Sequence, residues 1–395
     1  MPTSLLLILK PHRIARRPLK TAIIHYWLVG MRGGERVLEQ LCRLYPDADI
    51  YTHVFDPDRI SEDLKRHRIS STSIASLPFA RKLYKKYLGF MPRALEHIDL
   101  TGYDLVISSE SGPAKGVIAP PNARHICYCH SPMRYIWDYF HSYRSELGFP
   151  ARMVFDHVAH RLRQWDVTTA ARVNRFVANS AFVANRIQRY YGRSADVVHP
   201  PVALNTFRPV SAPSRDFYLI AGEIVPYKRV DLAIEAFRGL DRKLVISGRG
   251  SAAAKLQKNA PANVEFVGRV SDEKLASLYA NCRALIFPGE EDFGIVPLEV
   301  MASGRPVIAY GSGGALESVK DHETGLFFRQ QTAESLREAV TRFEGVETQF
   351  TPERVRSHAE RFSEERFREK FRQIVDSELS PSAVVTDARV EAPAA

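Results

Sequence analysis

Two glutamates separated by seven residues stand in the most informative stretch of the sequence, residues 284–319. Glu291 lies in an acidic loop after a short apolar run, and Glu299 follows Pro297, where the pattern predicts the first turn of a helix. Carboxylates at a loop and at a helix start can accept hydrogen bonds from the hydroxyls of a sugar and a ribose. The stretch therefore indicates a site for a hydroxyl-rich ligand.

A glycine-rich turn follows the second apolar run of the same stretch. Gly311, Gly313 and Gly314 would let the backbone approach a ligand closely, and a helix is predicted to open near Ala315. The free N–H groups at the start of a helix favour a phosphate. This turn therefore predicts that the hydroxyl-rich ligand also carries phosphate.

Two residues outside the stretch stand where apolar runs end. Lys228 follows the first apolar run of the second half of the chain, and a compact cation on a flexible stem suits a diphosphate. His130 ends another apolar run, and Ser131-Pro132 breaks the chain directly after it. Because ligands collect at the carboxyl ends of parallel strands, we expect both side chains at the same cleft.

The elements that must position these residues alternate between strands and helices. Strands are predicted over residues 22–26, 50–55, 103–108, 125–129, 175–179 and 196–199, and then over residues 217–221, 243–247, 264–267, 284–287, 306–310 and 325–328. Helical patterns, such as residues 35–45, lie between them. This spacing predicts βαβ units and an α/β fold of two doubly wound, Rossmann-like domains that face a cleft.

The length of 395 residues accommodates two domains of ordinary size. We expect an N-terminal domain over residues 20–203 and a C-terminal domain over residues 204–377, whose last helix can pack back on the first domain. Residues 1–19 precede the first predicted strand and residues 378–395 lack an apolar period. Both end segments are therefore expected to be disordered.

The run Glu291-Asp-Phe-Gly-Ile-Val-Pro-Leu-Glu299, followed by Gly304-Arg-Pro-Val-Ile-Ala, resembles the signature of the retaining, nucleotide-sugar-dependent glycosyltransferases of family 4. The resemblance covers about residues 20–377 and implies the GT-B fold, in which residues 20–203 would form the acceptor-side domain and residues 204–377 the nucleotide-sugar-binding domain. It implies a nucleotide sugar as substrate, with no separate cofactor, and we expect no catalytic metal because no convincing DxD motif is present. The string Cys129-His-Ser-Pro-Met-Arg-Tyr-Ile-Trp-Asp138 resembles bacterial mannosyltransferases, which implies mannose transfer from GDP-mannose to a lipid-linked saccharide of a surface polysaccharide.

The resemblance also implies roles for single residues. Glu291 would orient the sugar, Lys228 would bind the leaving diphosphate and His130 would stabilise the positively polarised sugar ring. Arg134 and Tyr135 would position the acceptor. The residues expected to bind the nucleotide sugar lie in strand-to-helix loops: Gly33, Gly34, Arg229, Gly248, Arg249, Arg269, Val270, Phe293, Gly294, Ile295, Val296 and Glu299.

Glu223 departs from the family pattern, because many members carry an arginine at this position. A glutamate cannot supply a second positive charge, so Arg229 or another cation has to compensate, or phosphate binding rests more on Lys228 and helix ends. Because of this departure, one alternative is that the chain is a module that binds a nucleotide sugar without turnover. A non-hydrolysing UDP-sugar epimerase, which shares the two-domain architecture, is another alternative.

The net charge of +10 favours an anionic partner. Residues 79–98 interleave cations with apolar side chains, which is typical of a basic amphipathic helix on an anionic membrane, although a solvated helix face is the alternative. Nucleic acid is disfavoured because no recognised binding motif accompanies the charge. The sequence has no apolar run near 18 residues and no signal-like N-terminus, and its cysteines are typical of free buried thiols. We therefore expect the chain in the cytoplasm, bound peripherally at the inner face of the plasma membrane.

Overall fold

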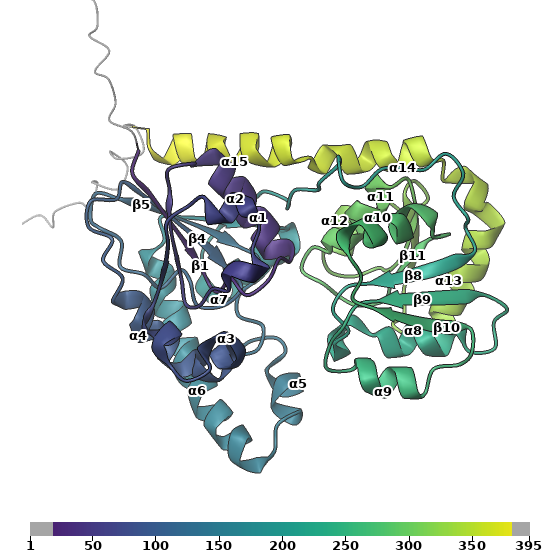
Figure 1. Cartoon of the computed structure of the whole chain (residues 1–395), viewed down its shortest axis with the longest axis horizontal. Helices are drawn as coiled ribbons and strands as arrows, with labels where there is room; N and C mark the ends of the chain where they lie inside the picture. The colour runs from purple at the N-terminus through teal and green to yellow at the C-terminus, as the bar shows by residue number, and fades with distance from the viewer. Residues whose placement is uncertain (1–18, 381–395) are drawn as a thin grey trace, which may run out of the picture.

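The computed structural model describes residues 19–380, which form two α/β domains side by side (Figure 1). The disorder expected for residues 1–19 and 378–395 falls almost entirely outside the described residues. Within them, the last helix continues to Glu378.

The N-terminal domain contains a seven-stranded sheet in the order β3-β2-β1-β4-β5-β6-β7, with every pairing parallel. The strands are β1 (Thr21–His25), β2 (Asp49–Thr52), β3 (Ile69–Ser71), β4 (Leu105–Glu110), β5 (Arg124–Cys129), β6 (Arg175–Ala178) and β7 (Ala195–Val197). All residues of β1 and β4 are buried, as expected for parallel strands covered on both faces. The strand order reverses between β1 and β4, which is where such a sheet opens for a ligand.

Helices cover both faces of this sheet. They are α1 (Gly33–Leu44), α2 (Glu62–Lys65), α3 (Ala80–Leu83), α4 (Met91–Glu96), α5 (Phe140–Ser145), α6 (Phe149–Thr169) and α7 (Ala181–Tyr191), with the 3-10 turns η1 (Pro57–Arg59), η2 (Ser73–Ser76), η3 (Tyr84–Phe90) and η4 (Ala170–Arg172). Val37, Leu38 and Leu41 of α1 are fully buried and share one core with Ile23 and Ile107 of the sheet. This packing fixes the start of α1 beside the carboxyl end of β1.

The segment 79–98 is not the continuous amphipathic helix that the sequence predicts. It is divided into α3, η3 and α4. Phe79, directly before α3, has a left-handed backbone with φ of 53°. Pro92 stands at the second position of α4, where its missing N–H is tolerated, so a new helix begins at Met91 instead of continuing the earlier one.

The C-terminal domain contains a six-stranded sheet in the order β10-β9-β8-β11-β12-β13, again with every pairing parallel. The strands are β8 (Phe217–Ala221), β9 (Lys243–Ser247), β10 (Val264–Gly268), β11 (Leu285–Phe287), β12 (Val307–Tyr310) and β13 (Gly325–Phe328). Here the order reverses between β8 and β11. The prediction of two doubly wound parallel sheets is therefore confirmed, although the short edge strand β3 was missed.

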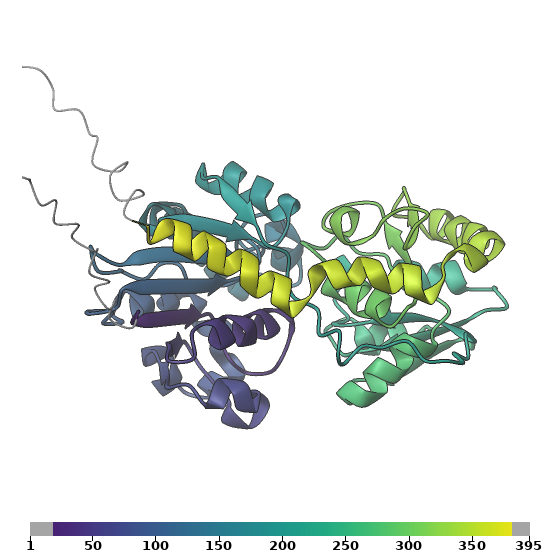
Figure 2. The same ribbon diagram turned by 90° about the horizontal axis from the view of Figure 1, so that it is seen from above.

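The helices of this half include one that returns to the first domain. They are α8 (Val230–Phe237), α9 (Ala253–Lys258), α10 (Asp272–Asn281), α11 (Ile295–Ala302), α12 (Ala315–Ser318), α13 (Ala333–Val346), α14 (Pro352–Ala359) and α15 (Glu364–Glu378), with the turns η5 (Pro226–Lys228), η6 (Glu347–Gln349) and η7 (Glu360–Phe362). Figure 2 shows α14 and α15 running across both domains. Phe367, Phe371 and Val375 of α15 are buried in the core of the N-terminal domain. This helix therefore connects the two domains.

Candidate active site

Lys228 and Glu291 form an ion pair where the strand order of the second sheet reverses. Lys228 ends η5, which follows β8, and Glu291 lies in the loop after β11. Lys228 Nζ lies 2.9 Å from Glu291 Oε1, and the two side chains are 17% and 16% exposed. Burial lowers the pKa of Lys228, but the charge of Glu291, the Tyr227 hydroxyl and the hydrogen bond to Glu291 together raise this pKa above its ordinary value. Both side chains line a pocket together with Gly222, Glu223 and Gly289.

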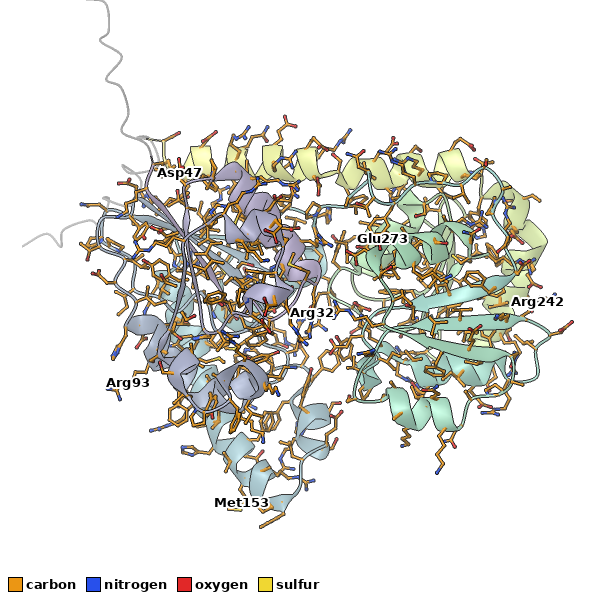
Figure 3. The ribbon with its side chains drawn as sticks, in the orientation of Figure 1. Arg32, Asp47, Arg93, Met153, Arg242 and Glu273 are labelled. Atoms are coloured by element: carbon orange, nitrogen blue, oxygen red, sulfur yellow. The ribbon has the colours of Figure 1, made fainter. Side chains whose placement is uncertain are left out.

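The two charged residues next to this pair have partners elsewhere. The Arg229 guanidinium lies 3.3 Å from the Asp231 carboxylate and 3.2 Å from the Gln331 side-chain oxygen. Glu223 is exposed, and it interacts with Arg32 of the other domain: burial lowers the pKa of Arg32, but the charge of Glu223 helps to raise it above its ordinary value. Figure 3 shows Arg32 on the side of the N-terminal domain that faces the second domain. The charge of Arg32 is thus close enough to that of Glu223 for the two to attract each other across the domain interface.

Glu299 lies in the second turn of α11, because that helix begins at Ile295, two residues earlier than predicted. The Tyr279 hydroxyl lies 3.1 Å from Glu299 Oε2 and donates a hydrogen bond to it. Burial raises the pKa of Glu299 to about 7, against the opposing effects of this hydrogen bond and of Arg36 in α1. The carboxyl group is thus held at the domain interface close to its titration point at neutral pH.

The glycine-rich turn after β12 packs against protein, which corrects the expectation that it is open to a ligand. A Cβ on Gly313 would lie 2.6 Å from the Glu291 carbonyl oxygen, and the Gly314 N–H donates to that same oxygen across 2.8 Å. The helix behind the turn, α12, has only four residues. These glycines therefore let the acidic loop lie directly against the turn.

The other residues expected to contact the nucleotide sugar lie at the carboxyl ends of neighbouring strands. Gly248 and Arg249 follow β9, and Arg269 and Val270 follow β10. After β11, Gly294 takes a left-handed backbone with φ of 77°, and the half-buried Ile295 and Val296 begin α11. Phe293 is only 2% exposed, and its ring centroid lies 5.2 Å from that of His199. The Phe293 side chain therefore belongs to the core, and its backbone is what can face a ligand.

His130 lies at the carboxyl end of β5, on the first sheet. Its Nε2 lies 2.9 Å from Ser109 Oγ, and burial, followed by the neighbouring His25 ring, lowers the pKa of His130 to about 3. Gly34 in the first turn of α1 leaves room for the Tyr26 hydroxyl, which a Cβ there would overlap, whereas His130 Nε2 would lie at an ordinary contact distance of 3.7 Å. His130 is therefore neutral and closely packed beside the start of α1.

The start of α1 meets the start of α11 across the domain interface. A Cβ on Gly33 would lie 3.7 Å from Ile295 Cγ2, and Arg36 Nη2 lies 3.2 Å from Asp272 Oδ2. Both helices have eight residues or more, so each presents free N–H groups and a positive dipole end. We call His130, the residues behind it and the start of α1 the N-terminal wall, and Lys228, Glu291 and α11 the C-terminal wall.

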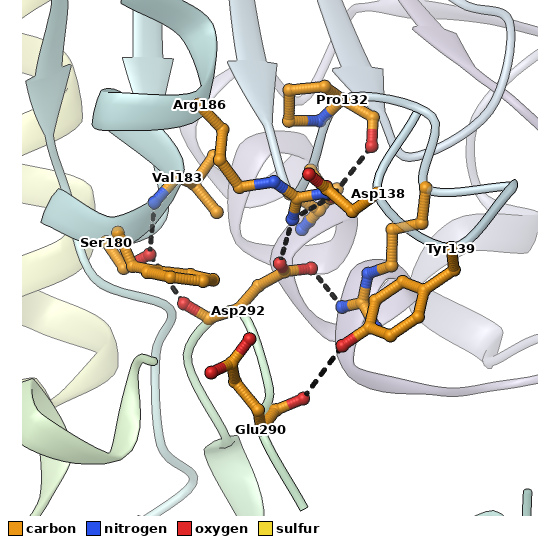
Figure 4. Close-up of polar contacts among 12 residues, drawn as sticks. Pro132, Asp138, Tyr139, Ser180, Val183, Arg186, Glu290 and Asp292 are labelled. Atoms are coloured by element: carbon orange, nitrogen blue, oxygen red, sulfur yellow. Dashed lines mark hydrogen bonds and ion pairs between the residues drawn. The ribbon is translucent and has the colours of Figure 1, made fainter. Parts of the chain in front are cut away.

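A buried ion cluster joins the two walls (Figure 4). Asp292, which is 5% exposed, pairs with Arg134 and Arg186, both from the N-terminal domain. Arg186 also pairs with Asp138. The Ser180 hydroxyl donates to the Asp292 carbonyl oxygen across 2.6 Å. The carboxylate that follows Glu291 in the chain is therefore fixed by the opposite domain.

The two residues expected to bind the acceptor, Arg134 and Tyr135, are in contact with other protein groups. The Arg134 guanidinium pairs with Asp292 and lies 5.2 Å from the centroid of the Tyr227 ring. The Tyr135 hydroxyl is buried and has no hydrogen-bond partner among residues 19–380. The Arg134 guanidinium is thus held by a carboxylate of the opposite domain, whereas the Tyr135 side chain packs within its own domain.

Sequence reasoning missed four residues that the structure brings to the site. Arg32 could have been noticed, because it directly precedes the glycine pair at the start of α1. Asp292 stands inside the glutamate motif, yet nothing in the sequence pairs it with Arg186, which lies more than 100 positions away. Ser109 lies near the buried end of an apolar strand, and no motif in the sequence marks its hydroxyl as functional. His25 similarly ends β1 without a recognisable motif.

Comparisons with known proteins match both halves of the chain. The family described as Glycosyltransferase Family 4 matches residues 31–206, and the family described as Glycosyl transferases group 1 matches residues 205–366. An uncharacterised glycosyltransferase of Methanocaldococcus jannaschii is 35% identical over 130 residues, which are 32% of this chain and 37% of that protein. A GDP-mannose-dependent alpha-mannosyltransferase of Mycolicibacterium smegmatis is 34% identical over 185 residues, 46% of this chain and 48% of that protein. The matched regions thus span less than half of these curated relatives.

The fold is shared with solved structures over nearly the whole chain. Anabaena HepE, crystallised in complex with UDP, superposes with a TM-score of 0.66 at 16% identity, covering 91% of this chain and 100% of that one. At this identity the likeness concerns the fold, and it extends over both domains and the helices that join them.

Proposed function

Since the chain belongs to glycosyltransferase family 4 and has the GT-B fold, we propose that it transfers a hexose from a nucleotide sugar with retention of configuration. The donor that we propose is GDP-mannose, and the acceptor is a lipid-linked saccharide of a bacterial surface polysaccharide. Support for mannose comes from residues 127–138 and 224–229 of the sequence and from the similarity to the Mycolicibacterium mannosyltransferase. The reaction that follows is built on the groups of the two walls.

The first requirement of this transfer is to stabilise the leaving diphosphate. Lys228 supplies a positive charge that is already held in place, and the start of α1 at Gly33 and Gly34 supplies backbone N–H groups. Arg32 adds a second cation on the opposite wall, which compensates for the glutamate at position 223. A nucleotide diphosphate bound between the walls would thus meet positive groups from both domains.

The second requirement is to take the proton from the acceptor hydroxyl. In the mechanism that we propose, the acceptor attacks from the face on which the leaving group departs, and the leaving phosphate accepts the proton. No carboxylate nucleophile and no metal ion takes part. Glu291 exchanges its bond to Lys228 for sugar hydroxyls, Glu299 accepts from the ribose, and the neutral His130 ring lies beside the sugar.

The observation that carries this proposal is the Lys228–Glu291 pair at the strand reversal of the second sheet, opposite His130. The test is a thermal-shift screen of GDP, UDP and ADP with their hexose conjugates, followed by measurement of nucleotide release with a lipid-linked acceptor. We expect GDP-mannose to give the largest rise in melting temperature, and GDP to be released only with acceptor present. Conversion of a UDP-sugar without acceptor would indicate the epimerase instead. Binding without any release of nucleotide would indicate the non-catalytic module.

We propose that residues 79–98 hold the enzyme against an anionic membrane, where a lipid-linked acceptor is found. Phe79 and Phe90 are 77% and 66% exposed, and Met153 near the start of α6 is 61% exposed on the same domain (Figure 3). The exposed cations of this segment include Arg81, Lys82, Lys85 and Lys86. Apolar side chains flanked by cations suit the headgroup region of an anionic leaflet. No helix among residues 19–380 is long and apolar enough to cross a bilayer.

Vesicle sedimentation tests this proposal. The protein should bind vesicles containing phosphatidylserine and not vesicles of phosphatidylcholine alone, and Lys85→Glu/Lys86→Glu should weaken binding at least tenfold, at about 1 kcal/mol for each lost cation and more for reversal. Lys255→Glu/Lys258→Glu on α9 of the other domain changes the charge equally and should leave binding unchanged. Equal loss in both variants would point to total charge and would refute a specific surface.

A further inference from the structure

His130 is the end of a chain of hydrogen-bonding side chains that runs into the N-terminal domain. His130 Nε2 lies 2.9 Å from Ser109 Oγ, and the same oxygen lies 3.0 Å from His25 Nδ1. These residues come from the carboxyl ends of β5, β4 and β1, which are neighbours in the sheet. Ser109 and His25 are 0% and 1% exposed, so water does not replace these bonds.

A single hydroxyl proton cannot serve both imidazole rings. Ser109 can donate to only one of the two nitrogens and must accept from the other. His130 is neutral because of its burial, so it carries one ring proton, either on Nε2 towards Ser109 or on Nδ1 away from it. Which arrangement exists depends on the far end of the chain, at His25.

Glu35 decides the arrangement at that end. His25 Nε2 is buried, has no hydrogen-bond partner among residues 19–380, and lies 3.9 Å from Glu35 Oε1. Glu35 is 2% exposed, and its other oxygen accepts the backbone N–H of Arg32 across 3.0 Å. A ring N–H facing this carboxylate is attracted, whereas a ring lone pair would be repelled, and both effects are strong away from water. In the neutral ring, His25 therefore carries its proton on Nε2 and accepts from Ser109 on Nδ1.

We propose that Glu35, His25 and Ser109 are positioning residues that fix His130 as the tautomer with its proton on Nε2. Ser109, having donated to His25, accepts from His130 Nε2. His130 Nδ1 has no hydrogen-bond partner among the described residues and is left as an acceptor. Resting on the proposed function, this means that His130 receives a hydrogen bond from a hydroxyl of the transferred hexose and disfavours a carbonyl or phosphate oxygen at the same place.

The direct test is the ring-nitrogen NMR spectrum of full-length protein labelled with ¹⁵N-histidine, because the protonated and unprotonated nitrogens of a neutral ring have distinct shifts. Comparison with His130→Gln assigns the signals. We expect wild-type His130 to carry its proton on Nε2 and Ser109→Ala to give a mixture of tautomers. Ser109→Thr, which keeps a hydroxyl, should restore the wild-type pattern. A wild-type His130 protonated on Nδ1, or an unchanged pattern in Ser109→Ala, would overturn the proposal.

A neighbouring serine supplies a matched control. Ser108 is also 0% exposed, stands on the same strand and bonds a buried histidine, His125, across 2.9 Å, yet it faces away from the chain that ends at His130. Ser108→Ala should therefore leave the His130 signals unchanged. With an active donor, kcat/KM should fall about tenfold in Ser109→Ala and less in Ser108→Ala, as for one misdirected hydrogen bond. The spectrum needs no substrate, so failure of the sugar-transfer assay would not be mistaken for failure of the tautomer assignment.

Discussion

The two walls of the site differ in charge and in the way in which their side chains are held. Around His130 the N-terminal wall presents neutral groups, since this ring is bonded to the buried hydroxyl of Ser109. The cation of this wall, Arg32, lies apart from them at the start of α1. The C-terminal wall presents Lys228 paired with Glu291, and near it the carboxyl group of Glu299 with a pKa of about 7.

The difference in charge indicates which part of a nucleotide sugar each wall suits. Hydrogen bonds buried in the sheet fix the neutral part of the N-terminal wall, around His130, in one arrangement, which suits a reacting sugar ring. Charges that pair with each other in the free protein can exchange that pairing for a charged ligand, which is what a diphosphate requires. The predictions that follow test this division of labour, beginning with the charged wall.

Lys228→Met should have the largest effect. The substitution keeps a long side chain but removes the charge that we propose stabilises the leaving diphosphate, so kcat/KM should fall by roughly 10²–10³. It also leaves Glu291 without its partner at 2.9 Å, which lowers the affinity for an anion further. The measurement is steady-state kinetics with the best donor of the screen, after circular dichroism has verified folding.

Lys243→Met is the matched control for this substitution. Lys243 also pairs with a glutamate, Glu265, across 2.7 Å, but both side chains are about half exposed and lie at the start of β9 and on β10, away from the strand reversal. Its kcat/KM should stay within a factor of two of the wild type. A similar loss in both variants would mean that the charged wall contributes through total charge alone.

Strands of the C-terminal sheet show what the sequence specifies well. Residues 217–221, 243–247 and 325–328 were predicted with the bounds that the structure has, because each is an apolar run that is buried in a parallel sheet and ended by polar or turn residues. β3 was missed because it has three residues at the sheet edge, with Ile69 as its one apolar residue. Residues 79–98 have a helical period, but tertiary packing and Pro92 divide them.

The site shows where sequence reasoning ends. The motif spacing identified Lys228 and Glu291 as separate candidates, yet their pairing depends on β8 and β11 being neighbours, which chain order does not state. The same holds for Asp292, whose two arginines lie 158 and 106 positions away in the sequence. The role of a loop glycine was also ambiguous in the sequence. Gly313 could let the backbone approach a ligand or pack closely against another loop, and only the structure shows that it packs against Glu291.

Asp292→Asn should have the next largest effect, because Asp292 joins the walls. Its loss leaves Arg134 and Arg186 without their shared carboxylate in a buried site, so the free energy of unfolding should fall by about 3 kcal/mol. The two domains should also separate more readily. Denaturant unfolding measures the first effect, and small-angle X-ray scattering measures the second as a larger radius of gyration.

Asp272→Asn is the matched control for Asp292→Asn. Asp272 also pairs with an arginine across the two domains, Arg36 at 3.2 Å, but the side chains are 74% and 46% exposed. An exposed pair contributes little, so the free energy of unfolding should change by less than about 1 kcal/mol and the scattering profile should stay the same. If Asp292→Asn were equally mild, the buried cluster would not be what holds the walls together.

The pH dependence of Glu299 should be the smallest effect and the sharpest test of the charged wall. Its pKa is raised to about 7 in the folded protein by burial, so the folded state binds this proton more tightly than the unfolded state. The free energy of unfolding contributed by this group should therefore rise as pH falls from 8 towards 5. Nucleotide affinity should change in the opposite direction, because the ionised carboxylate is the better acceptor for ribose hydroxyls, with a loss of about tenfold between pH 8 and pH 6.

Glu299→Gln, which does not titrate, should flatten both curves, as measured by calorimetric binding and chemical unfolding across this range. Affinity and stability that moved together with pH in the wild type would show that Glu299 does not face the nucleotide.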